Sequence, residues 1–276
     1  MKKLQTKGSW AVMLCGGLGS RMGSLTAEKP KSLLMVYGKP IIWYSFWTLY
    51  KHGCRNFILP LGYLGKMIQK YIHQITSEVQ CNIYTIDTGL ESSIANRIKQ
   101  VKHLIPENKD FLLLNTDTLF DFDIKAMNKV HVMRKSLVTL SSVEVISPWG
   151  VLTISGEDII NFDRNRKVQK LISNHTEEAY GVVNSGIAWI NKNALKMVDF
   201  ENENDFETEL FGAAIKAKKI SHFKIDGIWY PIDTPKDLNS INYAFNSNEK
   251  PKEILLSALS TISNSNLKNQ NNRLRL

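Results

Sequence analysis

A glycine-rich turn follows the first hydrophobic run of the sequence and is accompanied by three cationic side chains. The stretch LCGGLGSRMGSLTAEKPK covers residues 14–31 and carries Arg21, Lys29 and Lys31. Turns of this kind bind phosphates because several backbone N–H groups converge on one point. Arginine binds two phosphate oxygens at once, whereas lysine acts as a point charge. The stretch therefore predicts a phosphate site, with a solvated basic loop as the alternative interpretation.

Pro30 has a local effect on the two lysines beside it. A residue that precedes proline is driven into an extended conformation, which applies here to Lys29. In an extended chain, side chains two residues apart point the same way. We therefore expect Lys29 and Lys31 to face the same side of the turn.

The glycine spacing also fits a dinucleotide-binding fold. Gly17, Gly19 and Gly23 form a G-x-G-x-x-x-G variant of that fingerprint. Two features argue against it. The second expected strand, NFILPL, does not end in the acidic residue that would hold a ribose hydroxyl. Residues 24–31 also continue as a polar loop interrupted by proline rather than as a helix whose N-terminus holds a pyrophosphate. The Walker A pattern is absent too.

Two aspartates follow hydrophobic strands in the sequence. Asp117 comes directly after FLLLNT, and Asp233 comes directly after IWYPI. Ligands of open α/β sheets bind at strand ends, and two carboxylates can hold Mg²⁺ while phosphate oxygens and water fill its other positions. The alternative is that each aspartate only starts a turn or caps a helix. We expect that simpler role for Asp121 and Asp123.

No nucleophilic side chain stands out in the sequence. There is no G-x-S-x-G stretch and no evident Cys–His arrangement. A phosphate monoester has a second pKa of about 6 and is therefore already ionised at neutral pH. Such a substrate needs positioning and charge neutralisation rather than a general base.

Strand and helix patterns alternate along the chain that carries these residues. The alternation predicts an α/β fold with a parallel, doubly wound sheet. Two of the strands, Leu137–Val145 and Gly150–Ile154, are expected to pair with each other. The expected strands are Trp10–Cys15, Asn56–Leu61, Asn82–Ile86, Asp110–Asn115, Leu137–Val145, Gly150–Ile154, Asp158–Phe162, Gly186–Ile190 and Trp229–Ile232. The expected helices are Pro40–Lys51 with Pro40 at position N1, Gly65–Ile75, Ser93–Leu104, Asn193–Phe200 and Phe206–Ala217.

Length and composition narrow the class of protein. The 276 residues are 43% hydrophobic, which suffices for one sizeable core or two small ones. No apolar run approaches the ~20 residues of a membrane span, and no signal peptide is evident. Three cysteines without C-x-x-C spacing favour reduced thiols and a cytoplasmic location. The net charge of +9 favours acidic ligands; part of it lies in the Asn-rich end, residues 264–276, which we expect to be mobile. Aromatic residues do not interleave with a basic stripe, so neither nucleic acid nor membrane is an expected partner.

The two motifs together resemble the sugar-1-phosphate nucleotidylyltransferases. LCGGLGSRM…KPKSLLMVYGKPII is similar to the signature loop of that family, and GIWYPIDTPKDL to its C-terminal metal segment. Within the family, the stretches GKPIIWY, HGCRNFILPLGYLGKMIQKYI and DTGLESSIANRIK most resemble glucose-1-phosphate cytidylyltransferases. The resemblance runs from about Trp10 to Phe245. It implies a Rossmann-like, doubly wound mixed sheet in a single catalytic domain over residues 1–245, followed by a helix and tail over residues 246–276.

The resemblance also implies roles for individual residues. Those expected to surround the nucleotide are Leu14, Cys15, Gly16, Gly17, Leu18, Gly19, Ser20, Ser92, Arg97 and Thr116. Arg21 and Lys31 would hold the triphosphate, and Asp117 and Asp233 would bind Mg²⁺ as the cofactor; these four form the implied catalytic set. Gly150, Arg164 and Asn184 would contact the sugar phosphate.

The implied reaction transfers a nucleotidyl group from an NTP, with CTP favoured, to a sugar 1-phosphate, giving an NDP-sugar for surface polysaccharides and pyrophosphate. The expected partners of the protein are small molecules, and a homo-oligomer is possible.

Two stretches depart from the family pattern: Ile94-Ala95-Asn96-Arg97 replaces T-G-G-R, and Asp163-Arg164-Asn165 replaces E-K-P. The alternatives are another sugar, polyol or phosphonate with a different nucleotide, or a non-catalytic regulatory relative.

Overall fold

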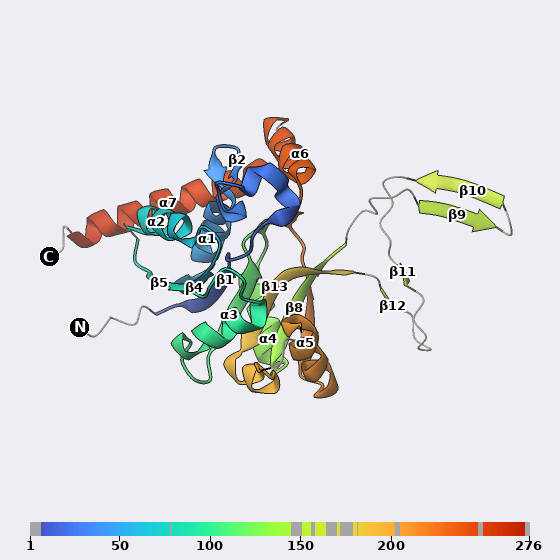
Figure 1. Cartoon of the computed structure of the whole chain (residues 1–276), viewed down its shortest axis with the longest axis horizontal. Helices are drawn as coiled ribbons and strands as arrows, with labels where there is room; N and C mark the ends of the chain where they lie inside the picture. Colours follow the sequence, from blue (N-terminus) through green and yellow to red (C-terminus); the bar gives the residue numbers. More distant parts are fainter. Residues whose placement is uncertain are drawn as a thin grey trace.

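A seven-stranded sheet forms the centre of the molecule (Figure 1). The computed structural model describes residues 7–77, 79–144, 151–155, 158–163, 170–171, 179–180, 182–201, 205–247 and 251–273. In spatial order the strands are β14 (Ile220–Lys224), β8 (Val138–Val143), β13 (Val183–Asn191), β6 (Asp110–Asn115), β1 (Ser9–Leu14), β4 (Cys54–Leu61) and β5 (Asn82–Asp87).

The sheet is mixed. β1 lies parallel to β4 on one side and to β6 on the other, and β4 is parallel to β5. β13 runs antiparallel to both β6 and β8. This insertion confirms the mixed, doubly wound sheet implied by the family resemblance, and it shows that strand–helix alternation alone overstated the parallel content.

One expected strand pair is wrong. The first expected partner corresponds to β8, which pairs with β13 and β14. The second corresponds to β9 (Val151–Ser155), which forms an antiparallel pair with β10 (Asp158–Asp163). The expectation assumed that strands adjacent in the sequence pair with each other. Instead β13, which lies later in the chain, forms an antiparallel pair with β8.

The first strand shows how the two faces of the sheet are buried. Trp10 and Val12 belong to one hydrophobic cluster, whereas Ala11 and Met13 belong to the other. This alternation is the period of two expected of a strand covered on both faces. Figure 1 shows α1, α2 and α7 on one side of the sheet and α3 and α5 on the other. The α-helices are α1 (Ile41–Lys51), α2 (Gly65–Thr76), α3 (Ile94–Val101), α4 (Ile124–Met133), α5 (Phe206–Lys216), α6 (Pro235–Asn246) and α7 (Pro251–Arg273).

Several short elements complete the described fold. The strand β7 (Thr118–Asp121) forms an antiparallel pair with β15 (Ile228–Pro231), away from the main sheet. The others are the 3-10 helices η1 (Ser20–Thr26), η2 (Lys31–Leu33), η3 (Lys102–Leu104) and η4 (Lys192–Met197), and the strand pairs β2 (Met35–Val36) with β3 (Lys39–Pro40) and β11 (Lys170–Leu171) with β12 (Ala179–Tyr180). The elements β7, α4, β14 and α6 were not expected from the sequence.

Helix boundaries differ from expectation at two places. Pro40 occupies the N-cap of α1 rather than its first helical position. The helix expected at Asn193–Phe200 is the 3-10 helix η4. The helix and tail expected over residues 246–276 correspond to α7, which extends through the Asn-rich stretch as far as Arg273. Ile254 and Ala258, in the first part of α7, are buried in the main hydrophobic cluster.

The described residues contain three free cysteines and no helix that is both long and apolar enough to cross a membrane.

Candidate active site

The glycine-rich turn lies at the carboxyl end of β1, in the middle of the sheet. Gly19 has a positive φ of 66°, a conformation that glycine adopts without strain. Its carbonyl accepts hydrogen bonds from the backbone N–H of Met22 (2.9 Å) and from Thr26 Oγ1 (3.1 Å), which close the turn. The chain then continues as η1, a 3-10 helix with a kink at Gly23, rather than as the long helix of a dinucleotide-binding fold. The structure therefore gives no support to that alternative.

A cavity of about 500 Å³ opens beside this turn. It is bounded by the turn, the ends of β1 and β6, the segment 90–94 and Asp233. Every nucleotide, triphosphate and metal residue expected from the sequence lines it: Leu14, Cys15, Gly16, Gly17, Leu18, Gly19, Ser20, Arg21, Lys31, Ser92, Arg97, Thr116, Asp117 and Asp233. Six other lining residues were not expected from the sequence: Ser32, Leu90, Glu91, Ser93, Ile94 and Asn115. Each lies within two residues of one that was expected, so adjacency was the signal that could have found them.

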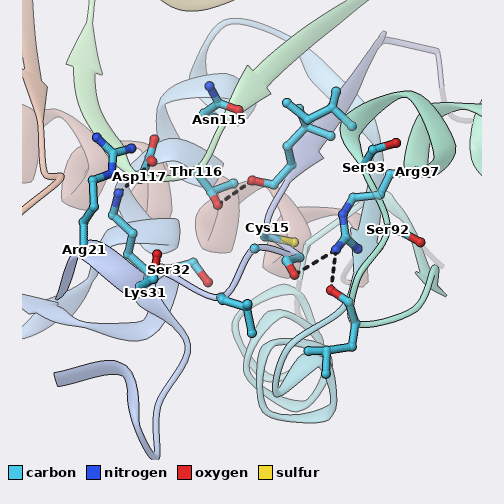
Figure 2. A pocket seen from close by; sticks show the side chains of 18 of the residues that line it. Cys15, Arg21, Lys31, Ser32, Ser92, Ser93, Arg97, Asn115, Thr116 and Asp117 are labelled. Carbon is cyan, nitrogen blue, oxygen red and sulfur yellow. Dashed lines mark hydrogen bonds and ion pairs between the residues drawn. The ribbon is translucent and has the colours of Figure 1, made fainter. Parts of the chain in front are cut away.

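The cavity has two chemically different ends (Figure 2). Arg21, Lys31 and Asp117 gather at one end, and Ser92, Ser93 and Arg97 lie at the other. The first is the charged end, and we call the second the loop end.

Two aspartates and two cations form a compact network at the charged end. Lys31 Nζ lies 2.8 Å from Asp117 Oδ2 and 2.8 Å from Asp233 Oδ1. Arg21 Nη1 lies 3.0 Å from Asp233 Oδ2. Burial by itself would raise the pKa of Asp233, but the hydrogen bond and charge of Lys31, together with Arg21, outweigh it and hold that pKa below its usual range. This lowered pKa favours the ionised form of Asp233, and the Asp117 and Asp233 carboxylates both contact the Lys31 ammonium.

A pair of strands outside the main sheet brings these aspartates together. Asp117 directly precedes β7, and Asp233 follows β15 with only Ile232 between them. In the register of this pair Thr118 lies opposite Pro231, and the N–H of Ile232 donates to the carbonyl of Asp117 at 2.9 Å. The strand pair thus fixes two residues that are far apart in the sequence.

The helix α6 that follows Asp233 is capped by residues other than Asp233. Thr234 is the N-cap of α6 and forms a reciprocal capping box with Asp237. The simpler role considered for Asp233 is therefore filled by its neighbours, and the Asp233 side chain faces the cavity instead. Asp123 caps α4, as expected, and Asp121 pairs with Lys51.

The donor set at the charged end fits a magnesium ion bound together with phosphates. The Lys31 ammonium lies between two carboxylate oxygens, so the site already accommodates a cation. Among the described residues no group of three or more His, Cys, Asp or Glu side chains could hold a metal. Magnesium prefers six oxygen ligands and commonly takes one or two from protein carboxylates and the rest from phosphate and water. Asp117 and Asp233 suit that division.

The two lysines of the loop do not face the same way. Pro30 is extended, but Lys31 begins the 3-10 helix η2, which ends the extended run. Lys31 lines the cavity, whereas Lys29 is exposed and does not. The expectation that both would face the same side of the turn is wrong, because proline restricts the conformation of the residue before it but not of the residue after it.

Arg97 is buried at the loop end, with 4% of its surface exposed. Its Nη1 donates to the carbonyl of Leu61 (3.0 Å) and to Thr88 Oγ1 (2.6 Å). Its Nη2 donates to the carbonyls of Gly16 (3.0 Å) and Leu90 (3.2 Å). Dashed lines in Figure 2 mark two of these bonds. All four N–H donors of the two terminal amino groups thus have protein acceptors.

Thr116 and Ser92 are also engaged by the protein. Thr116 Oγ1 donates to the carbonyl of Leu14 at 2.9 Å, which joins the ends of β6 and β1. Ser92 Oγ donates to the carbonyl of Thr88 and accepts from Asn96 Nδ2 at 3.2 Å. One lone pair of the Ser92 oxygen remains to accept a further hydrogen bond.

The residues expected on the sugar side are only partly described. Gly150 and Arg164 lie outside the described residues. Asn184 lies in β13, is exposed, and its Nδ2 donates to Glu207 Oε2 of α5 at 3.4 Å. Burial, and to a lesser degree the charge of Asp205, raises the pKa of Glu207 above its usual range. Glu207 was not expected from the sequence, because a glutamate in the first turn of a helix is also what helix stability favours.

Cys15 supplies a testable property of the cavity. Its thiol donates to the carbonyl of Pro60 (3.8 Å), and burial, opposed by Arg97, raises its pKa to about 12. The thiol is the poorly nucleophilic form. We therefore expect iodoacetamide at pH 8 to leave Cys15 unmodified in the folded protein and to modify it in denaturant, as measured by peptide mass spectrometry. Rapid modification of folded Cys15 that a nucleotide prevents would instead identify a reactive thiol in the cavity.

The mixed α/β sheet, the phosphate-type turn at its centre and the paired cations and carboxylates define a nucleotide-phosphate-binding enzyme fold. Comparison with known proteins agrees. The family model described as Nucleotidyl transferase matches residues 10–248. The chain belongs to this family, and curated relatives that match most of its length are sugar-1-phosphate nucleotidyltransferases.

Individual relatives show the range within the family. A probable glucose-1-phosphate cytidylyltransferase of Bacillus subtilis (strain 168) is 29% identical, over 87% of this chain and 97% of its own length. The glucose-1-phosphate cytidylyltransferase of Salmonella typhi is 26% identical, over 82% and 92%. The mannose-1-phosphate guanylyltransferase catalytic subunit beta of Xenopus tropicalis is 25% identical, over 82% and 62%.

Solved structures agree with the fold. HddC from Yersinia pseudotuberculosis matches with a TM-score of 0.60 and 22% identity, over 86% of this chain and 99% of that one. An apo UDP-glucose pyrophosphorylase matches with a TM-score of 0.65 and 15% identity, over 87% and 98%.

Proposed function

We propose that the protein transfers a cytidylyl group from CTP to a sugar 1-phosphate, producing a CDP-sugar and pyrophosphate. The observation that carries this proposal is the assembly of Arg21, Lys31, Asp117 and Asp233 at one end of the cavity that the glycine turn borders. A non-catalytic regulatory relative would have no need of this network. The preference for CTP is supported by the two cytidylyltransferases among the relatives.

The reaction requires a phosphate oxygen of the sugar 1-phosphate to attack the α-phosphorus of CTP in line. A new P–O bond forms as the bond between the α-phosphorus and the bridging oxygen to the β-phosphate breaks, and pyrophosphate leaves with that oxygen and its electron pair. The incoming phosphate is already ionised, so no side chain has to remove a proton. Positioning and charge neutralisation supply the rate enhancement.

The residues of the charged end divide this work. Lys31 and Arg21 bind the phosphate oxygens on which negative charge increases as pyrophosphate leaves. Asp117 and Asp233 would hold Mg²⁺, which neutralises phosphate charge when bound. The glycine turn presents backbone N–H groups without side chains that would keep a phosphate at a distance. Asn184, with Gly150 and Arg164, would contact the sugar phosphate.

Base selection is the second testable part of the proposal. Because Ser92 Oγ donates to Thr88, the oxygen can only accept from a ligand. Cytosine carries an amine where uracil carries a carbonyl oxygen, so an acceptor there favours cytosine. An unpaired buried polar group costs ~1–3 kcal/mol, and we therefore expect CTP to exceed UTP by at least about tenfold in kcat/KM. GTP and other purine nucleotides should be poorer still, because a larger base needs a larger pocket.

A competition experiment tests this choice. Equal concentrations of CTP and UTP are supplied with one sugar 1-phosphate, and the base of each product is identified by mass. Equal incorporation would leave the nucleotidyltransferase assignment unchanged and remove the cytidylyl assignment.

A pyrophosphate-release screen of four NTPs against hexose 1-phosphates, polyol phosphates and phosphonates identifies the acceptor. We propose that the product of the reaction is a precursor of surface polysaccharide made in the cytoplasm.

A further inference from the structure

Arg97 joins three separate segments that border the loop end of the cavity. Its terminal amino groups bind the glycine turn at Gly16, the end of β4 at Leu61, and the segment after β5 at Thr88 and Leu90. Thr88 strengthens the junction, since its N–H and its hydroxyl both donate to the Leu61 carbonyl, at 2.9 and 2.6 Å. Backbone hydrogen bonds already link these stretches in pairs, since Leu61 lies opposite Asp87 in the β4–β5 ladder and the N–H of Tyr63 donates to the Gly16 carbonyl at 3.2 Å. Arg97 is a single side chain that binds all three stretches at once.

Two glycines make room for the guanidinium. A Cβ added at Gly16 would lie 2.2 Å from Arg97 Nη1 and 2.5 Å from Cζ. A Cβ added at Gly62 would lie 2.5 Å from the Gly16 carbonyl and 2.7 Å from Arg97 Nη1. Neither glycine has a positive φ, so close packing rather than backbone conformation requires them. The guanidinium and the glycines therefore form one packed unit.

These contacts leave few donors for a ligand. Arginine has five N–H donors, and four are taken by protein acceptors. Reading a base through the terminal amino groups would require breaking hydrogen bonds to the carbonyls of Gly16, Leu61 or Leu90 or to the Thr88 hydroxyl, and the acceptor would lose that donor. Hydrogen bonds to a charged group contribute about 1.5–3 kcal/mol each, so such an exchange is unfavourable.

We propose that Arg97 is a positioning residue, which sets the glycine turn and the 88–90 segment around any bound nucleoside triphosphate and does not discriminate between bases. This inference rests on the proposed nucleotide site. It departs from the contact with the nucleotide that the family resemblance implied. Base discrimination then falls to groups that still have free hydrogen-bonding capacity, among them Ser92.

Base reading and loop positioning predict different losses of nucleotide affinity when Arg97 is replaced. A residue that reads the base changes the ratio of CTP to UTP affinity when it is removed. A residue that sets the loops lowers both affinities by the same factor. Since the sugar phosphate is expected at Asn184 in β13, which does not line this cavity, its KM should not change in the second case.

The test compares Arg97→Ala and Arg97→Lys with the unchanged protein. CTP and UTP binding are measured by calorimetry, kcat and both KM values by pyrophosphate release, and unfolding by thermal scan. We expect Arg97→Ala to weaken binding of CTP and UTP alike by about tenfold or more. We expect Arg97→Lys, which keeps the buried charge, to recover part of that loss. It also serves as the test variant if Arg97→Ala does not fold.

A second arm uses the packed glycine. Gly16→Ala should reproduce the loss of nucleotide affinity, because its Cβ would displace the Arg97 guanidinium. The double variant Gly16→Ala, Arg97→Ala should bind nucleotide no more weakly than the poorer single variant, since both changes disrupt the same unit. Arg134→Lys, at the exposed C-cap of α4, is the matched control, and Ser92→Ala is the comparison expected to change the CTP-to-UTP ratio.

Two results would overturn the inference. One is a loss confined to CTP, which would assign base reading to Arg97. The other is a lower thermal midpoint with unchanged nucleotide affinities, which would make Arg97 purely structural. Failure of the proposed function looks different, because the unchanged protein itself would then bind neither CTP nor UTP.

Discussion

The Asp117→Asn variant should turn over about 10²–10³ times more slowly than the unchanged protein, because it loses a charged ligand that neutralises phosphate in the transition state. The substitution keeps the size of the side chain and one acceptor oxygen. Asp117 is about one third exposed, and partly exposed ion pairs contribute at most about 1 kcal/mol to stability, so the fold should persist. Asp233→Asn should behave alike, since the β7–β15 pair directs both carboxylates to the same point.

Turnover measured across a range of Mg²⁺ concentrations, together with a thermal scan, tests this pair of variants. Asp226→Asn changes the charge equally at an exposed position outside the cavity and is the control. Near-normal turnover of Asp117→Asn at saturating Mg²⁺ would show that Asp117 is not a metal ligand.

Lys31→Ala should have opposite effects on catalysis and on metal binding. We expect turnover to fall by about 10²-fold, because the variant removes a cation that faces the leaving pyrophosphate. In the absence of nucleotide we expect tighter binding of a divalent ion, by about fivefold or ~1 kcal/mol, because the ammonium no longer competes for the two carboxylates. The competition follows from the two distances of 2.8 Å between Lys31 Nζ and the aspartate oxygens.

Paramagnetic resonance of Mn²⁺ added without nucleotide measures the second effect independently of activity. Lys29→Ala removes the same charge from the exposed side of the loop and should leave both quantities nearly unchanged. A larger catalytic loss in Lys29→Ala than in Lys31→Ala would transfer the role to Lys29. Weaker Mn²⁺ binding in Lys31→Ala would show that the lysine assists metal binding instead of competing with it.

Residues close together in the chain could be placed on the site from the sequence. The glycine turn, Arg21, Lys31 and the end of the strand that leads into Asp117 all line one cavity. Such patterns are local, since a turn after a strand and a cation a few residues away depend little on the rest of the fold. The same local reasoning gave the wrong orientation for Lys29 relative to Lys31. Pro30 restricts the residue before it but does not predict the 3-10 helix that begins at Lys31.

Most strands of the main sheet, the helices α1, α2, α3 and α5 and the family could be read from the chain, because hydrophobic periodicity and motif spacing are properties of short stretches. The strand β14 and the helix α4 could not. Three features required the folded molecule: the antiparallel insertion of β13, the meeting of Asp117 with Asp233 through β7 and β15, and the commitment of Arg97 to four protein acceptors. Each of these depends on hydrogen bonds between segments far apart in the chain. Whether a donor such as Arg97 remains available to a ligand is decided by how many acceptors the folded chain brings to it, and no local pattern records that number.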